Sequence, residues 1–428
     1  MNSNFFLSMM LLGFVTFASK AQESSNEDQK SDVAEEIISE QALQVSFVPV
    51  LGTNFKPYGQ SLNNVSLNIF AGYNYGVNGV ELGGFVNVDR SDVKYLQLSG
   101  FVNLVGGNVT GFQGAGFVNG VKQQVTGAQM AGFVNMSKGL TGVQGSGFVN
   151  YAHGDVIGGQ GSGFVNYAHG DITGVQGTGF VNFALGDVVG AQGSGFVNYA
   201  KSVKGVQGAG FVNYANDSLK GAQLSGFYNH AKEVNGVQAS GFANYTKTLR
   251  GFQFGIINIA DTVEKGATIG FLNIVRTGKH EVALSYNDIT DINAAFRSGT
   301  DKFYSVLEVG IQTGDNPLWA VGAGFGTQFK PIKDKFVTSV ELASFGVNRV
   351  DDFQDDLNQV TKLSVNVGYK IFKTLSVNAG PILNISTSRS VNADGSYGLG
   401  LGENGFYDQT FSGTNVKAWV GYHVGVRF

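Results

Sequence analysis

The sequence is dominated by a short repeat whose core reads Gly-Phe-Val-Asn. A Phe preceded by Gly recurs every 15 or 16 residues from Phe85 to Phe242, and altered copies follow at Ile256 and Phe271. An Asn lies two positions after each Phe, and these residues are Asn87, Asn103, Asn119, Asn135, Asn150, Asn166, Asn182, Asn198, Asn213, Asn229 and Asn244. Helical solenoids need units of about 33 to 47 residues, so a period this short excludes them.

A repeat of this length accommodates two short strands and two turns, which predicts an all-β solenoid. With rungs stacked about 4.8 Å apart, roughly 13 rungs form a rod of about 60 Å. Stacking places identical residues above one another, so Asn side chains can form hydrogen-bonded ladders and Phe rings can stack. We therefore expect the Asn residues, together with Phe148, Phe164, Phe180 and Phe196, to form internal structural ladders rather than a binding surface. Alternation alone leaves open which parity of the repeat faces inward.

Recognition, if the rod has a ligand, is expected at the variable positions after each Asn. His153 with Asp155 and His169 with Asp171 suggest a metal stripe, but only two copies carry both residues and His-Gly-Asp suits a turn. We therefore predict no metal site there and no cofactor. The acidic segment 351–356 is interpreted as a solvated loop rather than a calcium site.

The first 43 residues precede the strand-rich part of the chain. The apolar run Phe5–Phe17 followed by Ala18-Ser19-Lys20-Ala21 is typical of a signal peptide, residues 1–21, cleaved after Ala21. An acidic tether, residues 22–43, is expected next.

The final segment predicts a transmembrane β-strand. From Val416 to Phe428 apolar residues alternate with polar or small ones over a length that suits a tilted strand across a bilayer. Similar alternation elsewhere predicts an antiparallel transmembrane β-barrel of 8 to 10 strands. We assign residues 44–75 to N-terminal barrel strands, 76–275 to the solenoid and 276–428 to C-terminal barrel strands. Tyr422 and the terminal Phe428 are interpreted as the barrel-assembly signal.

The number of barrel strands decides on which side of the membrane the rod lies. If Ile292–Arg297 is a strand, the count is ten and the rod faces the periplasm. If it is not, and one strand precedes the array, the count is eight and the rod faces outward. The sequence leaves both possibilities open.

The Gly-Phe-Val-Asn array between the strand Asn64–Tyr75 and the trailing barrel strands resembles surface-repeat proteins of Bacteroidetes. The resemblance covers nearly all of the chain after the signal peptide. It implies a location in the outer membrane of a Gram-negative bacterium and surface display, and it supplies no activity, ligand or site residues.

Composition and motifs narrow the possible functions. The formal net charge is −4 and the pI about 5.8, so no basic patch favours nucleic acid, and the absence of Cys excludes thiolate chemistry. No Ser/His/Asp grouping is visible, so we predict a protein that is not an enzyme.

The leading interpretation is a rod presented for surface interaction or adhesion, with an unknown protein or glycan ligand. The alternatives are a structural, periplasm-facing envelope component and, less favoured, a transporter or membrane-embedded enzyme. Expected partners are outer-membrane lipid and the barrel-assembly machinery.

Overall fold

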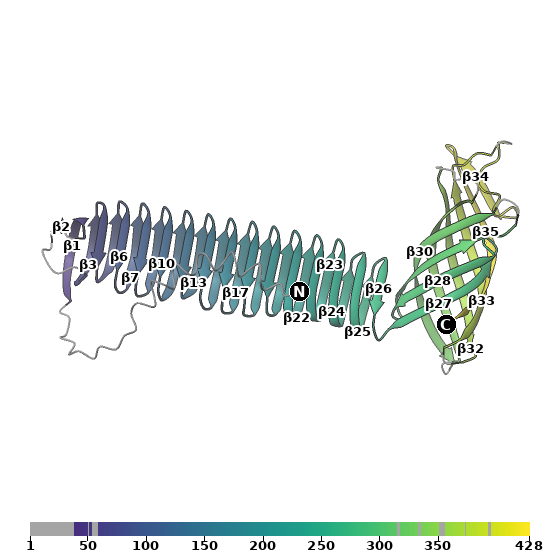
Figure 1. Ribbon diagram of the computed structural model, residues 1–428, viewed down its shortest axis with the longest axis horizontal. Helices are drawn as coiled ribbons and strands as arrows, with labels where there is room; N and C mark the ends of the chain where they lie inside the picture. The colour runs from purple at the N-terminus through teal and green to yellow at the C-terminus, as the bar shows by residue number, and fades with distance from the viewer. Residues whose placement is uncertain are drawn as a thin grey trace.

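The computed structural model describes residues 38–49, 51–53, 59–314, 317–332, 335–350, 356–372, 374–392 and 395–428. These residues form strands, turns and bends without helices, so the predicted all-β class is confirmed. Among them, no helix has the length and apolar character needed to cross a membrane. The predicted signal peptide lies outside the described residues, as does the tether up to residue 37. Figure 1 shows two parts, a long rod and a barrel.

The rod is a β-solenoid of about 13 turns. Its strands belong to one hydrogen-bonded network in which the pairings are parallel, apart from the β1–β2 hairpin. They are β1 (Ser39–Val48), β2 (Leu51–Gly52), β3 (Ser61–Asn68), β4 (Ala71–Asn74), β5 (Gly76–Gly83), β6 (Val86–Asp89), β7 (Val93–Ser99), β8 (Val102–Val105), β9 (Val109–Ala115), β10 (Val118–Val121), β11 (Gln124–Ala131), β12 (Val134–Ser137), β13 (Gly139–Ser146), β14 (Val149–Ala152), β15 (Val156–Ser162), β16 (Val165–Ala168), β17 (Ile172–Thr178), β18 (Val181–Ala184), β19 (Val188–Ser194), β20 (Val197–Ala200), β21 (Val203–Ala209), β22 (Val212–Ser225), β23 (Tyr228–Ser240), β24 (Ala243–Phe254), β25 (Ile257–Ile269) and β26 (Leu272–Val275).

One rung consists of a long strand, a tight turn, a short strand and a second turn. In β15 and β16 the side chains of Val156, Gln160, Asn166 and Ala168 point inward, and Tyr167 points outward. The interior thus has an apolar half, built from the Val and Ala columns, and a polar half, built from the Gln and Asn columns. Neighbouring rungs pair in register at the column positions, as β14 with β16 and β15 with β17 do, so each column is continuous along the rod. The register shifts in the β3–β5, β22–β23 and β24–β25 pairings lie between the column positions.

The prediction that residues 44–75 belong to the barrel is wrong. β1 pairs in parallel with β3, and β3 pairs in parallel with β5, so these strands are the first rungs of the rod. In these rungs Asn63 and Asn74 occupy the positions of the Val and Ala columns, and Asn63 donates to Asn74 at 2.9 Å. Asn68 joins the first rungs to the Asn column by donating to Asn87 at 2.9 Å. The predicted tether also overlaps the rod, since β1 begins at Ser39.

The barrel is an antiparallel sheet of eight strands, closed by pairing of its first strand with its last. The eight strands are β27 (Lys279–Asn287), β28 (Ile292–Gly299), β29 (Tyr304–Ile311), β30 (Leu318–Ile332), β31 (Phe336–Arg349), β32 (Asn358–Lys370), β33 (Ser376–Ser388) and β35 (Thr414–Arg427). The short strand β34 (Tyr407–Phe411) forms a hairpin with the part of β35 that extends beyond β27.

The barrel has a rod end and a loop end. At the rod end lie the start of β27, the C-terminus and the ends at which β28 meets β29, β30 meets β31 and β32 meets β33. At the loop end lie the opposite ends of these strands and the hairpin of β34 with β35. The predicted range of 8 to 10 strands is confirmed, since the barrel has eight. Ile292–Gly299 is a strand, as the ten-strand count required, but among the described residues no barrel strand precedes the rod. The side of the membrane on which the rod lies stays a prediction.

The rod joins the barrel through three residues, Arg276 to Gly278, and through contacts of its last rung. The backbone N–H of Asn273 donates to Oγ of Ser305 at 3.3 Å, and Oγ of Ser298 donates to the carbonyl of Asn273. A ring nitrogen of His280 lies 2.8 Å from the carbonyl oxygen of Val275. β26 therefore lies across the outer wall of β27, β28 and β29, and the rod extends sideways from the barrel (Figure 1).

Candidate functional site

The Asn column is a continuous buried amide ladder, as the repeat predicted. Asn166 donates to Oδ1 of Asn182 at 2.9 Å and to the carbonyl of Gly177 at 2.8 Å, and it accepts from Asn150 at 3.0 Å. The same pattern joins the predicted ladder residues, each of which is fully buried: Asn87, Asn103, Asn119, Asn135, Asn150, Asn166, Asn182, Asn198, Asn213, Asn229 and Asn244. The ladder satisfies polar groups that would otherwise be costly to bury.

A second amide ladder runs beside it in the opposite sense. Gln160 donates to Gln144 in the preceding rung, whereas Asn166 donates to the following rung. Since a chain of donors needs a final acceptor, its N-terminal end requires a group that only accepts. That group is Glu81, which occupies the Gln position of its rung and accepts from Gln97 at 2.7 Å.

A second carboxyl lies beside this terminus. Asp89 is buried and accepts from Gln97 at 2.7 Å. Burial, and next the nearby charge of Glu81, raise the pKa of Asp89 well above its usual value, and burial also raises the pKa of Glu81. The N-terminal rungs therefore contain an acidic pair that favours holding a proton.

The Phe column stacks as predicted but lies on the outside of the rod. Rings of Phe133 and Phe148 are parallel with centroids 4.8 Å apart, and the stack continues through Phe164, Phe180 and Phe196. The expectation that Phe forms an internal ladder is wrong, because the Gly-Phe pair forms the turn between the two strands and directs the ring outward. We call this column the Phe edge: Phe47, Phe70, Phe85, Phe101, Phe117, Phe133, Phe148, Phe164, Phe180, Phe196, Phe211, Phe227, Phe242, Ile256 and Phe271.

A shorter aromatic column lies on the outer face of the short strands. Tyr151, Tyr167, Phe183, Tyr199 and Tyr214 stack in turn, and His230 continues the column with its ring 4.2 Å from that of Tyr214. Burial, with smaller effects of Lys232 and Lys247, lowers the pKa of His230 to about 4. His230 is therefore uncharged at neutral pH.

The His-Asp turns lie at the opposite edge of the rod, where His153 and His169 are exposed and stack at 5.2 Å. Among the described residues, no group of three or more His, Cys, Asp or Glu side chains is placed to hold a metal ion. Of the acidic segment 351–356, only Asp356 lies within the described residues.

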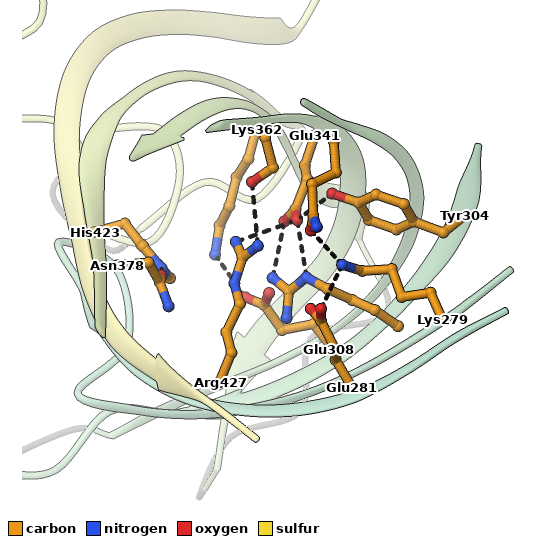
Figure 2. Close-up of polar contacts among 12 residues, drawn as sticks. Lys279, Glu281, Tyr304, Glu308, Glu341, Lys362, Asn378, His423 and Arg427 are labelled. Carbon is orange, nitrogen blue, oxygen red and sulfur yellow. Dashed lines mark hydrogen bonds and ion pairs between the residues drawn. The ribbon is translucent and has the colours of Figure 1, made fainter. Parts of the chain in front are cut away.

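The barrel interior is filled by ion pairs, shown in Figure 2. Glu341 accepts two hydrogen bonds from Arg297, both at 2.8 Å, one from Tyr304 at 2.8 Å and one from Arg427 at 3.3 Å. Lys362 lies 3.6 Å from Glu308. A bidentate Arg-carboxylate pair is geometrically specific and rigid, so this cluster braces four strands from inside.

Two further pairs extend the polar interior. Nζ of Lys279 lies 2.6 Å from Glu281, and a ring nitrogen of His423 lies 2.6 Å from Asn378. A cavity of about 20 Å³ at the rod end has room for about one water molecule.

The loop end is closed by an apolar cluster. Ile289, Phe345, Val360 and Trp419 pack together with Leu399 from the segment between β33 and β34. Nε1 of Trp419 donates to Asp288 at 2.6 Å beneath them. Eight-stranded barrels have interiors just wide enough for their own side chains, and here those side chains occupy both ends.

The outer wall of the barrel has the opposite character. Exposed positions carry Val282, Leu284, Val365 and Val367, and the predicted assembly-signal residues Tyr422 and Phe428 are exposed on the same face at 54% each. Their role in assembly stays a prediction. Apolar residues outside and ion pairs inside reverse the pattern of a water-soluble protein.

Sequence reasoning missed the Arg297–Glu341–Arg427 cluster and the Glu81–Asp89 pair. Glu341 and Arg297 are single charged residues within alternating strands, and nothing in the sequence shows that the barrel brings them together. The sequence alone could have identified Glu81, because it lies 16 residues before Gln97 and therefore occupies the Gln position of the repeat. No known family model, curated protein or solved structure matches this chain.

Proposed function

We propose that the chain is an outer-membrane protein whose barrel anchors a periplasm-facing rod, and that it acts as a non-catalytic structural component of the envelope. The observation that carries this proposal is the shared end of the barrel. The rod and the C-terminus lie at the end where β28 meets β29, β30 meets β31 and β32 meets β33, and only a few residues separate the two strands of each pair in the sequence. Outer-membrane barrels have short periplasmic turns and longer extracellular loops.

Membrane insertion is supported by the distribution of side chains. Strands β30 to β33 have 13 to 15 residues, which exceeds the length needed to cross the bilayer at a tilt. Their outward residues are mainly apolar, as in barrels that face lipid, and their inward residues include the polar and charged groups of the interior below the apolar cluster at the loop end. The filled interior favours an anchor over a channel.

Surface adhesion, the leading interpretation of the sequence, needs the rod on the side of the long loops. Eight barrel strands follow the rod, and an even number of crossings returns the chain to the side on which it started. The rod and the C-terminus are therefore on the same side of the barrel. The resemblance to surface-repeat proteins does not choose between the two sides. The envelope-component interpretation is therefore the better supported.

The absence of cysteine allows a direct test by single-cysteine labelling in cells. We expect a membrane-impermeant maleimide to label Glu403→Cys, in the loop-end segment, on intact cells. It should label His169→Cys, in an exposed turn of the rod, only after the outer membrane is permeabilised. Labelling of His169→Cys on intact cells would contradict the proposed side, and labelling of neither variant on intact or permeabilised cells would contradict the outer-membrane location.

A further inference from the structure

The rod is amphipathic from one edge to the other. Along the Phe edge the turn residues are Gly and Phe, and Phe180 is 38% exposed while Phe271 is 55% exposed. The charged residues between Asp92 and Lys265 lie in the opposite turn or at the start of the long strand that follows it. In β22 to β25, where one continuous strand replaces the two, they lie at the register positions of that turn. We call this opposite side the charged edge. An apolar ridge of this length exceeds the patches that soluble monomers usually expose.

The stacking of the rings limits what the Phe edge can bind. Neighbouring rings cover one another's faces at centroid distances near 4.8 Å, so only the ring rims point outward. Sugar and peptide recognition by aromatic side chains uses ring faces or polar groups beside them, and the flanking positions here are Gly, Ser, Ala and Thr. A continuous hydrocarbon-like ridge instead fits an acyl environment.

The junction with the barrel fixes the direction in which the ridge points. His280, Ser298 and Ser305 form one row across β27, β28 and β29 near the rod end, and β26 lies over that row with Val275 at β27 and Asn273 over β28 and β29. β26 therefore runs across these three strands near the rod end of the barrel. Figure 1 shows β26 pointing down toward the rod end, so the edge with the Phe turns faces the loop end.

The same junction holds the rod across the barrel. In Figure 1 the long axis of the rod runs sideways, across the direction of the barrel axis. A bilayer that surrounds the barrel therefore extends alongside the rod. Phe296 and Val309 are exposed on the outer wall of the barrel, on the loop-end side of the junction. The Phe edge faces this same side. Interfacial proteins bury an apolar side in the boundary between headgroups and acyl chains and keep charges in water.

We propose that the Phe edge inserts into the lipid leaflet next to the rod end of the barrel, so that the rod lies along the membrane. The charged edge then faces the aqueous compartment. This inference rests on the proposed membrane anchoring of the barrel and goes beyond it, because anchoring of the barrel alone does not specify what the Phe edge contacts.

Tryptophan quenching by brominated acyl chains tests the proposal on the full chain reconstituted into phosphatidylcholine vesicles. Phe180→Trp places the probe on the Phe edge, and Leu185→Trp places it on the charged edge of the same rung, where the native side chains are each 38% exposed. After subtraction of the signal of the unsubstituted protein, whose two Trp residues are constant, Phe180→Trp should lose most of its fluorescence and Leu185→Trp little.

A third variant separates failure of this inference from failure of the anchor. Val420 is 67% exposed on the outer wall of the barrel, so Val420→Trp should be quenched wherever the barrel is in the bilayer. Quenching at Val420→Trp with none at Phe180→Trp would overturn the inference alone, and absence of quenching at both would overturn the anchor. A blue-shifted but unquenched Phe180→Trp whose shift depends on protein concentration would also overturn it, in favour of pairing between two rods.

Discussion

At the residue scale, the amide of Asn166 shows why this repeat tolerates a polar interior. Its side chain makes hydrogen bonds to the rung before, the rung after and a backbone carbonyl. Each neighbour in the column does the same, so the polar half of the core carries its own partners. The strict spacing of Asn in the sequence already predicted this role.

Replacing Asn166 should therefore be costly. Asn166→Ala leaves the amide of Asn150 and the carbonyl of Gly177 without their partner, and each unsatisfied buried group costs about 1–3 kcal/mol. Hydrogen exchange should show faster opening of rungs around residue 166. Tyr167→Phe, whose side chain points outward in the same strand, should leave exchange unchanged. Equal exchange rates in both variants would contradict the conclusion that the Asn hydrogen bonds stabilise the rungs.

The acidic pair predicts a pH-dependent N-terminus of the rod. The raised pKa of Asp89 means that the folded rungs keep a proton that the unfolded chain releases. Their stability is therefore full below about pH 4, the usual pKa of Asp, and declines as pH rises from there through the raised folded value. Hydrogen exchange in rungs 59–105 should accelerate over that range.

Asp89→Asn removes the group that titrates while keeping an acceptor for Gln97. We expect it to flatten the pH dependence and to slow exchange at pH 8. Rungs around residue 200, which carry Gln and Ala in the equivalent columns, serve as an internal control. An unchanged pH dependence in Asp89→Asn would contradict the assignment.

At the element scale, a glycine within the long strand and the Gly-Phe turn after it interrupt the alternation of inward and outward side chains. These two interruptions decide which residues face inward. Gly158 has φ 128°, and a Cβ there would lie 2.0 Å from the carbonyl oxygen of Gly142. This glycine changes the strand's direction, and the Gly-Phe turn changes it again. In an uninterrupted strand, Gln160 and Phe164 would lie on the same face because they are four residues apart. In the structure Gln160 is buried, whereas Phe164 lies at the edge.

Two glycines of one strand make a matched pair of substitutions. Gly158→Ala forces a side chain into the left-handed region, at about 1–2 kcal/mol, and into the neighbouring backbone. Gly161→Ala meets no atom within 4 Å and should be nearly neutral. Thermal unfolding followed by circular dichroism should show a lower transition for Gly158→Ala only. A similar loss in both variants would mean that the close approach of rungs is not the cause.

At the scale of the whole molecule, rod and barrel share one pattern of side chains. In β3, Ser66 and Asn68 are buried while Leu67 is exposed, and in β32, Asn366 is buried while Val365 and Val367 are exposed. The alternation in residues 44–75 therefore could not distinguish a rung from a barrel strand. The existence of both parts followed from repeat period and strand length, but their boundary depended on pairing partners far apart in the chain.

The barrel's stability should depend on its inner ion pairs. Glu341→Gln leaves Arg297 and Arg427 without a carboxylate in a buried site, and breaking such pairs costs about 3–5 kcal/mol. The folded band on unheated gels should convert to the unfolded band at a lower temperature than in the unsubstituted protein. Glu403→Gln, in an exposed loop, provides the control. An unaltered conversion temperature for Glu341→Gln would contradict bracing by the cluster.

The residue-for-residue register between rungs has a consequence for heredity. Because Val165 to Ala168 pair in step with Val181 to Ala184, a recombination event that duplicates one repeat inserts a rung that fits both neighbours. The gene can thus change the reach of the rod in steps of about 4.8 Å, while the barrel and the first rungs stay as they are. Length is then a trait on which selection can act separately from every other property of the protein.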